Sequence, residues 1–137
     1  MKIAIVGCRG IPNTYGGFEQ FAEYLSVGLV QKGHNVVVFN SHDHPYREDS
    51  YLGVEIARAY DPGQYIGSAS QFIYDYLGIR GTTRRMPDII LLLGYGSSAL
   101  PLMLSRTGSS LVITNMDGME WMRAKWSRPV KAFFKWS

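Results

Sequence analysis

The chain has 137 residues, of which 46% are hydrophobic and 18% are charged, with a net charge of +3. This length and composition predict one folded domain and exclude an intrinsically disordered chain. A single cysteine, Cys8, excludes a disulfide framework and a zinc finger. No apolar run approaches the roughly 20 residues of a transmembrane helix, and the N-terminus lacks signal-peptide features, so we expect a cytoplasmic protein.

The first 40 residues have the pattern of a strand, a helix and a second strand. Ile3–Val6 is a short apolar run that predicts a buried parallel strand. A glycine-rich loop follows, and Phe18–Leu29 then has apolar residues at helical spacing, with Gly33 ending the helix. The polar residues of this helix fall on its opposite face: Glu19, Glu23 and Ser26. Val36–Phe39 predicts the second strand, which completes a βαβ unit.

The rest of the chain continues this alternation. Further strands are predicted at Val54–Ala57, Ile89–Leu93 and Leu111–Thr114, and further helices at Ser68–Leu77 and Ala99–Ser105. The segment Gly78–Met86 contains three arginines and is interpreted as a basic loop. The alternation predicts an α/β fold, a Rossmann-like doubly wound parallel sheet with strand order 3-2-1-4-5.

Sheets of this kind bind ligands at the carboxyl ends of their strands, where the strand order reverses. Three loops are expected to meet there: Gly7–Gly17, Gly94–Ser98 and Asn115–Glu120. The candidate functional residues are therefore sought in these loops.

The first loop ends in Gly16 and Gly17 at a predicted helix start. Free amides and the helix dipole favour an anion there, so a diphosphate is the candidate ligand, with Arg9 adding a positive charge. A tight turn that binds no ligand is the alternative interpretation. A nicotinamide-binding fingerprint is disfavoured, because Arg9 and Pro12 replace the required glycines and Asn40 replaces the ribose-binding acid.

The third loop contains the carboxylates Asp117 and Glu120. Either side chain is suited to accept a proton or to bind a sugar hydroxyl, and Asp117 is equally suited to stabilise the start of a helix. For Glu120 the pattern favours the helix start. The alternation of His42, Asp43 and His44 in one loop does not define a metal-binding geometry, so no metal site is predicted.

Residues 121–137 are basic and aromatic, with five basic residues and no acid. This composition suits contact with an anionic membrane surface, but packing against the rest of a larger protein is the favoured interpretation. No nucleic-acid-binding module accompanies it, so nucleic acid is not an expected partner. Pro129 is suited to begin a helix, and the helical pattern runs on to the last residue, as expected of a piece of a longer chain.

Three stretches, Met1–Glu19, Leu29–Val38 and Asn115–Trp126, resemble the N-terminal half of a group of bacterial glycosyltransferases. These enzymes have the GT-B fold, belong to the retaining type of glycosyltransferase family four, and are often labelled rhamnosyltransferases. Residues 42–87 match only loosely.

The resemblance implies that residues 1–137 form the acceptor-side Rossmann-like domain of a two-domain enzyme, whose nucleotide-sugar domain is absent from this chain. It implies that Gly16 and Gly17 approach the donor diphosphate and that no metal or cofactor is needed. Asp117 takes the place of a histidine that often lies near the donor sugar in related enzymes, and is the candidate catalytic residue. The candidates for binding the acceptor or the sugar are Tyr15, Tyr95 and Glu120.

Two functions are therefore carried forward. The first is transfer of a sugar, with rhamnose as the candidate, from a nucleotide-sugar to a polysaccharide or lipid-linked acceptor at the inner face of the membrane. The second is a stand-alone Rossmann-like module that binds a nucleotide or a partner and catalyses nothing.

Overall fold

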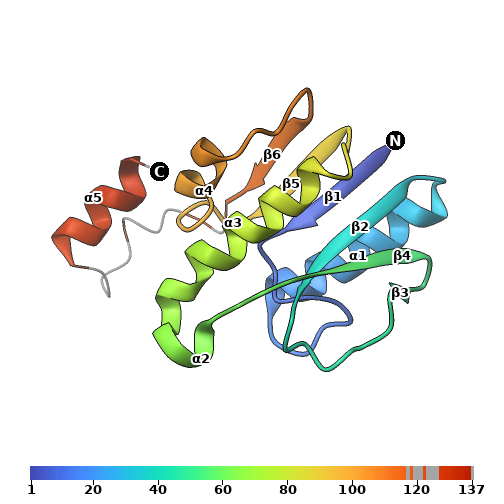
Figure 1. Ribbon diagram of the computed structural model, residues 1–137, viewed down its shortest axis with the longest axis horizontal. Coiled ribbons are helices and arrows are strands. Elements are labelled where there is room, and N and C mark those ends of the chain that lie inside the picture. The colour runs from blue at the N-terminus through green and yellow to red at the C-terminus, as the bar shows by residue number, and fades with distance from the viewer. Residues whose placement is uncertain (117, 119–121, 123–126, 137) are drawn as a thin grey trace.

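The computed structural model describes residues 1–116, 118, 122 and 127–136. The described residues form a six-stranded sheet with helices on both faces (Figure 1). Its strands are β1 (Lys2–Val6), β2 (Asn35–Ser41), β3 (Ser50–Tyr51), β4 (Val54–Ala59), β5 (Ile89–Leu93) and β6 (Leu111–Asn115). The strand order is β3-β4-β2-β1-β5-β6, and all neighbours except β3 and β4 run parallel.

The five parallel strands confirm both the predicted fold class and the predicted strand order. β3 is an addition that was not predicted, and it pairs with β4 in an antiparallel hairpin. The two hairpin residues, Leu52 and Gly53, both have positive φ, at 47° and 85°. Such a turn normally carries Asn or Asp followed by glycine, so leucine in the first position concealed it in the sequence.

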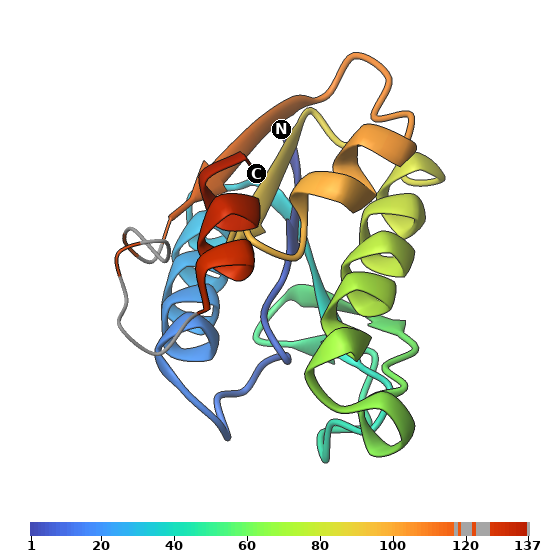
Figure 2. The same cartoon turned by 90° about the vertical axis from the view of Figure 1, so that its left-hand side faces the viewer.

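Helices cover the two faces of the sheet unequally (Figure 2). The helical segments are α1 (Gly17–Gln31), α2 (Gly63–Ile66), the 3₁₀ turn η1 (Gly67–Ala69), α3 (Ser70–Thr83), α4 (Ala99–Leu104) and α5 (Arg128–Trp136). α1 covers one face, α3 and α4 cover the other, and α5 lies beyond the carboxyl ends of the strands. No described helix has the length and apolar character needed to cross a membrane.

α1 ends as predicted, but its polar residues do not all face solvent. Gly33 follows the helix with φ of +84°, a conformation in which glycine is favoured. Glu19 and Ser26, which were predicted on the polar face, are instead buried. Ser26 donates a hydrogen bond to the Glu23 carbonyl, and Glu19 binds the glycine-rich loop, so both side chains have polar partners inside the fold.

α3 corrects the prediction of a basic loop at Gly78–Met86, because the helix continues to Thr83. Its two glycines face the sheet. A Cβ atom at Gly78 would lie 2.7 Å from Val6 Cγ1, and one at Gly81 would lie 2.5 Å from Phe39 Cε1. The glycines thus allow the helix to approach the sheet closely, a requirement that the local sequence does not reveal.

The hydrophobic core has one layer on each face of the sheet. On the α1 side it includes Ile3, Ile5, Val36, Val38 and Ile56. On the α3 side it includes Ala4, Val6, Phe39, Tyr74 and Ile90. Alternate residues of β1 and β2 therefore contribute to opposite layers, as expected of central strands that are buried on both faces.

Candidate functional site

The glycine-rich loop after β1 is held in place by side chains from α1 and β2. The buried Glu19 carboxylate accepts a hydrogen bond from the Arg9 amide at 2.7 Å. Asn40, fully buried at the end of β2, accepts one from the Ile11 amide at 3.0 Å and donates one to the Ile11 carbonyl at 2.8 Å. Asn40 therefore anchors the loop at the position where a dinucleotide-binding protein carries its ribose-binding acid.

The second half of the loop is held in the same way. Glu23 accepts a hydrogen bond from the Asn13 amide at 2.7 Å and another from the Tyr51 hydroxyl at 2.9 Å. The Asn13 side chain in turn accepts one from the Tyr15 amide at 3.0 Å. The amides of residues 9, 11, 13 and 15 are thus all bound by side chains, which gives this long loop a single defined conformation.

Gly16 and Gly17 lie where the loop enters α1. Gly16 is the N-cap and has no side chain to bind the first-turn amides. A Cβ atom built at Gly17 meets no atom within 4 Å, so the space beside it is open. The Oε2 atom of Glu19 lies 3.3 Å from the corresponding Cβ position at Gly16, which places one carboxylate beside this helix start. Sequence reasoning missed this role of Glu19.

Two of the residues predicted for this site, Arg9 and Tyr15, lie against each other. The Arg9 guanidinium carbon is 4.5 Å from the centroid of the Tyr15 ring, and both side chains are exposed. Tyr95, another residue predicted for the site, is only 7% exposed and packs against Phe134 of α5, with ring centroids 6.3 Å apart. The structure therefore presents Arg9 and Tyr15 at the surface and covers the Tyr95 ring.

A row of side chains runs from Arg9 along the carboxyl ends of the neighbouring strands. The Arg9 carbonyl accepts a hydrogen bond from the Ser41 amide, and the His42 amide donates one to the Ala59 carbonyl. These backbone bonds bring the three segments that carry Arg9, His42 and Tyr60 next to one another at the strand ends. The His42 and Tyr60 rings are in contact, with centroids 4.6 Å apart.

Asp43 is part of the same row and is exposed. A hydrogen bond from Ser41 lowers the pKa of Asp43, and His42 and Arg9 lower it further through their charges. Asp43 is therefore an ionised carboxylate within reach of the charges of Arg9 and His42. We name Tyr15, Arg9, Asp43, His42 and Tyr60 the strand-end row.

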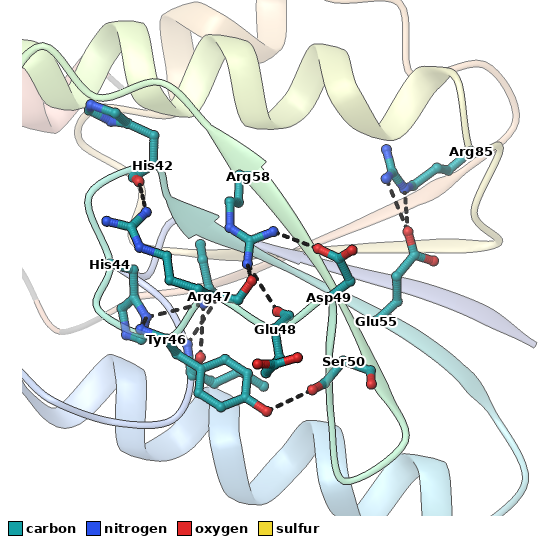
Figure 3. A network of polar contacts seen from close by, with 12 residues as sticks. His42, His44, Tyr46, Arg47, Glu48, Asp49, Ser50, Glu55, Arg58 and Arg85 are labelled. Atoms are coloured by element: carbon teal, nitrogen blue, oxygen red, sulfur yellow. Dashed lines mark hydrogen bonds and ion pairs between the residues drawn. The ribbon is translucent and has the colours of Figure 1, made fainter.

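The loop that carries His42 and Asp43 is held by arginines (Figure 3). Arg47 donates a hydrogen bond to the His42 carbonyl at 2.7 Å. Arg58 binds the Arg47 and Glu48 carbonyls and forms an ion pair with Asp49 at 2.8 Å. These bonds from the strand residue Arg58 connect the loop to β4, so the strand-end row rests on a fixed backbone.

Each histidine of this loop accepts a backbone hydrogen bond at its Nδ1 atom. His42 Nδ1 accepts a hydrogen bond from the Asp61 amide at 3.0 Å, and His44 Nδ1 accepts one from the Tyr46 amide at 3.2 Å. Burial is the largest cause that lowers the pKa of His44. In the part of the chain that the structure describes, no group of three His, Cys, Asp or Glu side chains is placed to hold a metal ion.

Asp75 of α3 is a buried carboxylate that sequence reasoning missed. It is 2% exposed, accepts a hydrogen bond from Gln71 Nε2 at 2.9 Å, and is hydrogen-bonded to Ser97 in the loop after β5. Burial raises the pKa of Asp75 from 3.8 to about 6. The four-residue spacing of Gln71 and Asp75, which puts both on one helix face, is the sequence signal that was overlooked.

Tyr74, beside Asp75, joins two strand ends. Its hydroxyl lies 2.6 Å from the Cys8 carbonyl oxygen and 2.7 Å from the Phe39 carbonyl oxygen, and these two acceptors share its single proton. Cys8 itself is buried, and burial raises the pKa of its thiol to about 12. The thiol is therefore protonated at neutral pH and acts as a small core residue.

Asp117 and Glu120, the predicted carboxylates of the third loop, lie outside the described residues. The loop begins after Asn115, whose carbonyl accepts a hydrogen bond from the Gly94 amide at 3.0 Å. The described part of the basic aromatic segment includes α5. Its Phe133 contacts Phe72 of α3, with centroids 5.9 Å apart, so this ring packs on the same domain.

The fold and the loops at its strand ends define a Rossmann-like α/β domain with a candidate ligand site at the carboxyl edge of the sheet. Residues 1–137 match the family described as a domain of unknown function, DUF1972, and the chain belongs to this family. This domain is found at the N-terminus of glycosyltransferases in some families. A comparison with curated proteins finds no match.

Proposed function

We propose that this chain is the N-terminal, acceptor-side domain of a GT-B glycosyltransferase. In this proposal the enzyme transfers a sugar, with rhamnose as the candidate, from a nucleotide-sugar to a glycan or lipid-linked acceptor at the inner face of the membrane. The observation that carries the proposal is the match of the whole chain to a family associated with glycosyltransferases. A second, nucleotide-binding domain completes the enzyme.

The loop of residues 7–17 is proposed to approach the donor diphosphate. Three observations support this role: the open space beside Gly17, the uncapped first-turn amides of α1, and the exposed guanidinium of Arg9. Backbone amides at a helix start stabilise an anion without reorganisation, because the fold already holds them in place. The anchoring of this loop by Glu19, Asn40 and Glu23 supplies that rigidity.

The strand-end row is proposed to bind the acceptor. Tyr15 and Tyr60 expose 72% and 49% of their surfaces, and their flat rings suit the apolar face of a sugar. The carboxylate of Asp43 accepts hydrogen bonds from hydroxyl groups, and Arg9 donates them. The exposed rings and the Asp43 carboxylate together suit a polyhydroxyl compound.

Asp117 remains the candidate catalytic carboxylate, and Tyr95 and Glu120 remain candidates for binding the sugar or the acceptor. These roles rest on the sequence and its resemblance. We propose that the reaction needs no metal ion or cofactor, in keeping with that resemblance.

The substitution Gly17→Val tests the role of the loop. A valine side chain here enters open space, so the fold is expected to tolerate it, while its methyl groups obstruct approach to the first-turn amides. We expect transfer of labelled sugar from a dTDP-sugar to fall about 100-fold, as for loss of a principal anion-binding group. The assay uses the natural polypeptide that contains this domain.

Gly28→Val is the matched control, because Gly28 also lies in α1 and a Cβ atom there meets nothing within 4 Å. This variant is expected to keep full transfer. Equal transfer by the wild-type and Gly17→Val proteins would exclude the loop from donor binding. Absence of transfer from any nucleotide-sugar by the wild-type polypeptide would favour the alternative of a non-catalytic binding module.

A further inference from the structure

A second candidate site lies between α3 and the chain that follows α4. It is a cavity of about 210 Å³ lined by Tyr76, Arg80, Thr83, Leu104, Ser105 and Arg106. The residues from α3 are four and three positions apart and so share one helix face. α3 runs opposite to the parallel strands, so this cavity lies away from their carboxyl ends and from the strand-end row (Figure 1).

The charge around this cavity is positive and unbalanced. Arg80 and Arg106 are both exposed, and neither has an acidic partner among the described residues. By contrast, Arg58 pairs with Asp49 and Arg85 pairs with Glu55. From residue 89 to residue 116, the sequence contains no charged residue other than Arg106.

A structural role explains only one of these arginines. Arg80 lies in the last turn of α3, where a cation complements the helix dipole. Arg106 lies beyond the end of α4, at Leu104, in a segment without helical structure. Two like charges beside one cavity repel each other, and an anion between them would convert the repulsion into attraction.

The hydroxyl groups beside this cavity are not equally available. The Ser105 Oγ atom is buried, so it does not open onto the cavity, although it has no hydrogen-bond partner in the described part of the structure. The Thr83 hydroxyl already donates to the Arg80 carbonyl at 2.7 Å. The donors left for a ligand are the Tyr76 hydroxyl and the two guanidinium groups.

We propose that this cavity binds a phosphate group. A phosphate offers several acceptor oxygens, which match two guanidinium groups and a hydroxyl better than a carboxylate does. Both a free phosphate compound and a lipid headgroup carry this group. A lipid is considered because α4 and its end expose apolar side chains that suit contact with a membrane: Leu100, Met103 and Leu104.

The first experiment titrates the 137-residue chain with inorganic phosphate and with pyrophosphate at constant ionic strength, followed by calorimetry and by amide chemical shifts. Shifts are expected at Ser105 and Arg106. Arg80→Gln and Arg106→Gln are each expected to raise the Kd about tenfold, the loss of one charge-assisted hydrogen bond. Arg84→Gln is the matched control, because Arg84 is an exposed arginine one turn from Arg80 that does not line the cavity.

Tyr76→Phe keeps the proposal testable if an arginine variant unfolds. This substitution removes only the hydroxyl of a side chain that lines the cavity, so the fold is expected to tolerate it. We expect the Kd for phosphate to rise about threefold, as for loss of one neutral hydrogen bond.

The second experiment measures sedimentation with vesicles of phosphatidylglycerol and with vesicles of phosphatidylcholine. Phosphate binding that requires Arg80 and Arg106 but not Arg84 supports a free phosphate compound. Binding to phosphatidylglycerol vesicles with the same residue dependence, without a response to inorganic phosphate, supports a lipid headgroup. No response to any probe, or equal losses in all three arginine variants, would overturn the proposal.

Discussion

The glycine-rich loop and α3 both adjoin the end of β1, yet the fold holds them by different interactions. The loop is held by side chains that bind its backbone amides from α1 and β2. α3 is held by close contact with the sheet, at Gly78 against Val6 and at Gly81 against Phe39. Glycine therefore has two roles here. In the loop it allows a backbone conformation with positive φ, and in α3 its lack of a side chain lets the helix lie close to the sheet.

The two regions also treat buried polar groups differently. In the loop, two carboxylates and two side-chain amides accept hydrogen bonds from backbone N–H groups, so these side chains take the place of the hydrogen bonds of regular structure. In α3, Asp75 binds the polar side chains Gln71 and Ser97, and burial keeps its pKa high. The loop therefore depends on backbone partners, whereas this part of α3 depends on a side-chain cluster that titrates.

Gly10→Ala should break the loop and produce the largest effect. Gly10 has φ of +134°, and a Cβ atom there would lie 2.5 Å from Asn40 Cγ. Backbone strain and displacement of Asn40 together are expected to lower the free energy of unfolding by at least about 3 kcal/mol. Urea denaturation measures the change. Gly17→Ala is the control, because a Cβ atom there is unobstructed, and equal losses in both variants would contradict this account.

The Asp75 cluster should make the stability of the α3 region depend on pH. Burial raises the pKa of Asp75 from 3.8 to about 6, so the folded state binds the proton more tightly than the unfolded state does. The contribution of Asp75 to stability is therefore full below pH 3.8 and is lost as the pH rises to about 6. The loss amounts to about 3 kcal/mol across this window.

The measurement compares the wild-type chain with Asp75→Asn by urea denaturation at several pH values. Asparagine does not titrate, so the free energy of unfolding of the wild type should fall relative to that of Asp75→Asn as the pH rises. A difference that stays constant between pH 4 and 7 would show that Asp75 titrates normally.

Gly81→Ala should test close packing of α3 without changing the backbone conformation. The added methyl group would lie 2.5 Å from Phe39 Cε1, so the helix or the ring must move, at a cost of about 2 kcal/mol. Gly28→Ala in α1 is the opposite case, because a Cβ atom there meets nothing within 4 Å. It should stabilise the chain by about 0.5–1 kcal/mol through helix propensity. Thermal unfolding of both variants should show opposite signs.

Glu19→Gln should give the smallest effect. Glutamine keeps an oxygen that accepts the Arg9 amide, but it removes the negative charge beside the start of α1. We expect a loss of about 1 kcal/mol in chemical denaturation, from the helix dipole and the weaker hydrogen bond. Glu48→Gln removes the same charge from an exposed loop residue and should be neutral. A similar loss in both would indicate a general effect of net charge.

The sequence sufficed for the parallel sheet and its order, because apolar runs of four or five residues and their spacing are local signals. It also placed the glycine-rich loop and the start of α1 correctly at Gly16 and Gly17. The full extent of α3 was missed, since glycine within a helix reads as a break until the residues that it faces are known.

The candidate site was predictable in its location and only partly in its composition. Loop order along a doubly wound sheet implies that the segments after β1 and β5 meet, and this follows from the chain alone. The contributions of His42, Asp43 and Tyr60 depend on the pairing of β2 with β4 and on the loop anchored by Arg58. Such contacts join residues that are distant in sequence, so no local pattern announces them.

By itself, the amino-acid sequence determined the class of fold, the strand order and the edge of the sheet where a ligand is expected. Tertiary structure decided which polar side chains serve that edge and which serve the core. Three buried side chains show this, because each has a hydrogen-bond partner inside the fold: Glu19, Asn40 and Asp75. The physical reason is that a strand or helix follows from local periodicity, whereas a buried polar group is defined by contacts across the whole fold.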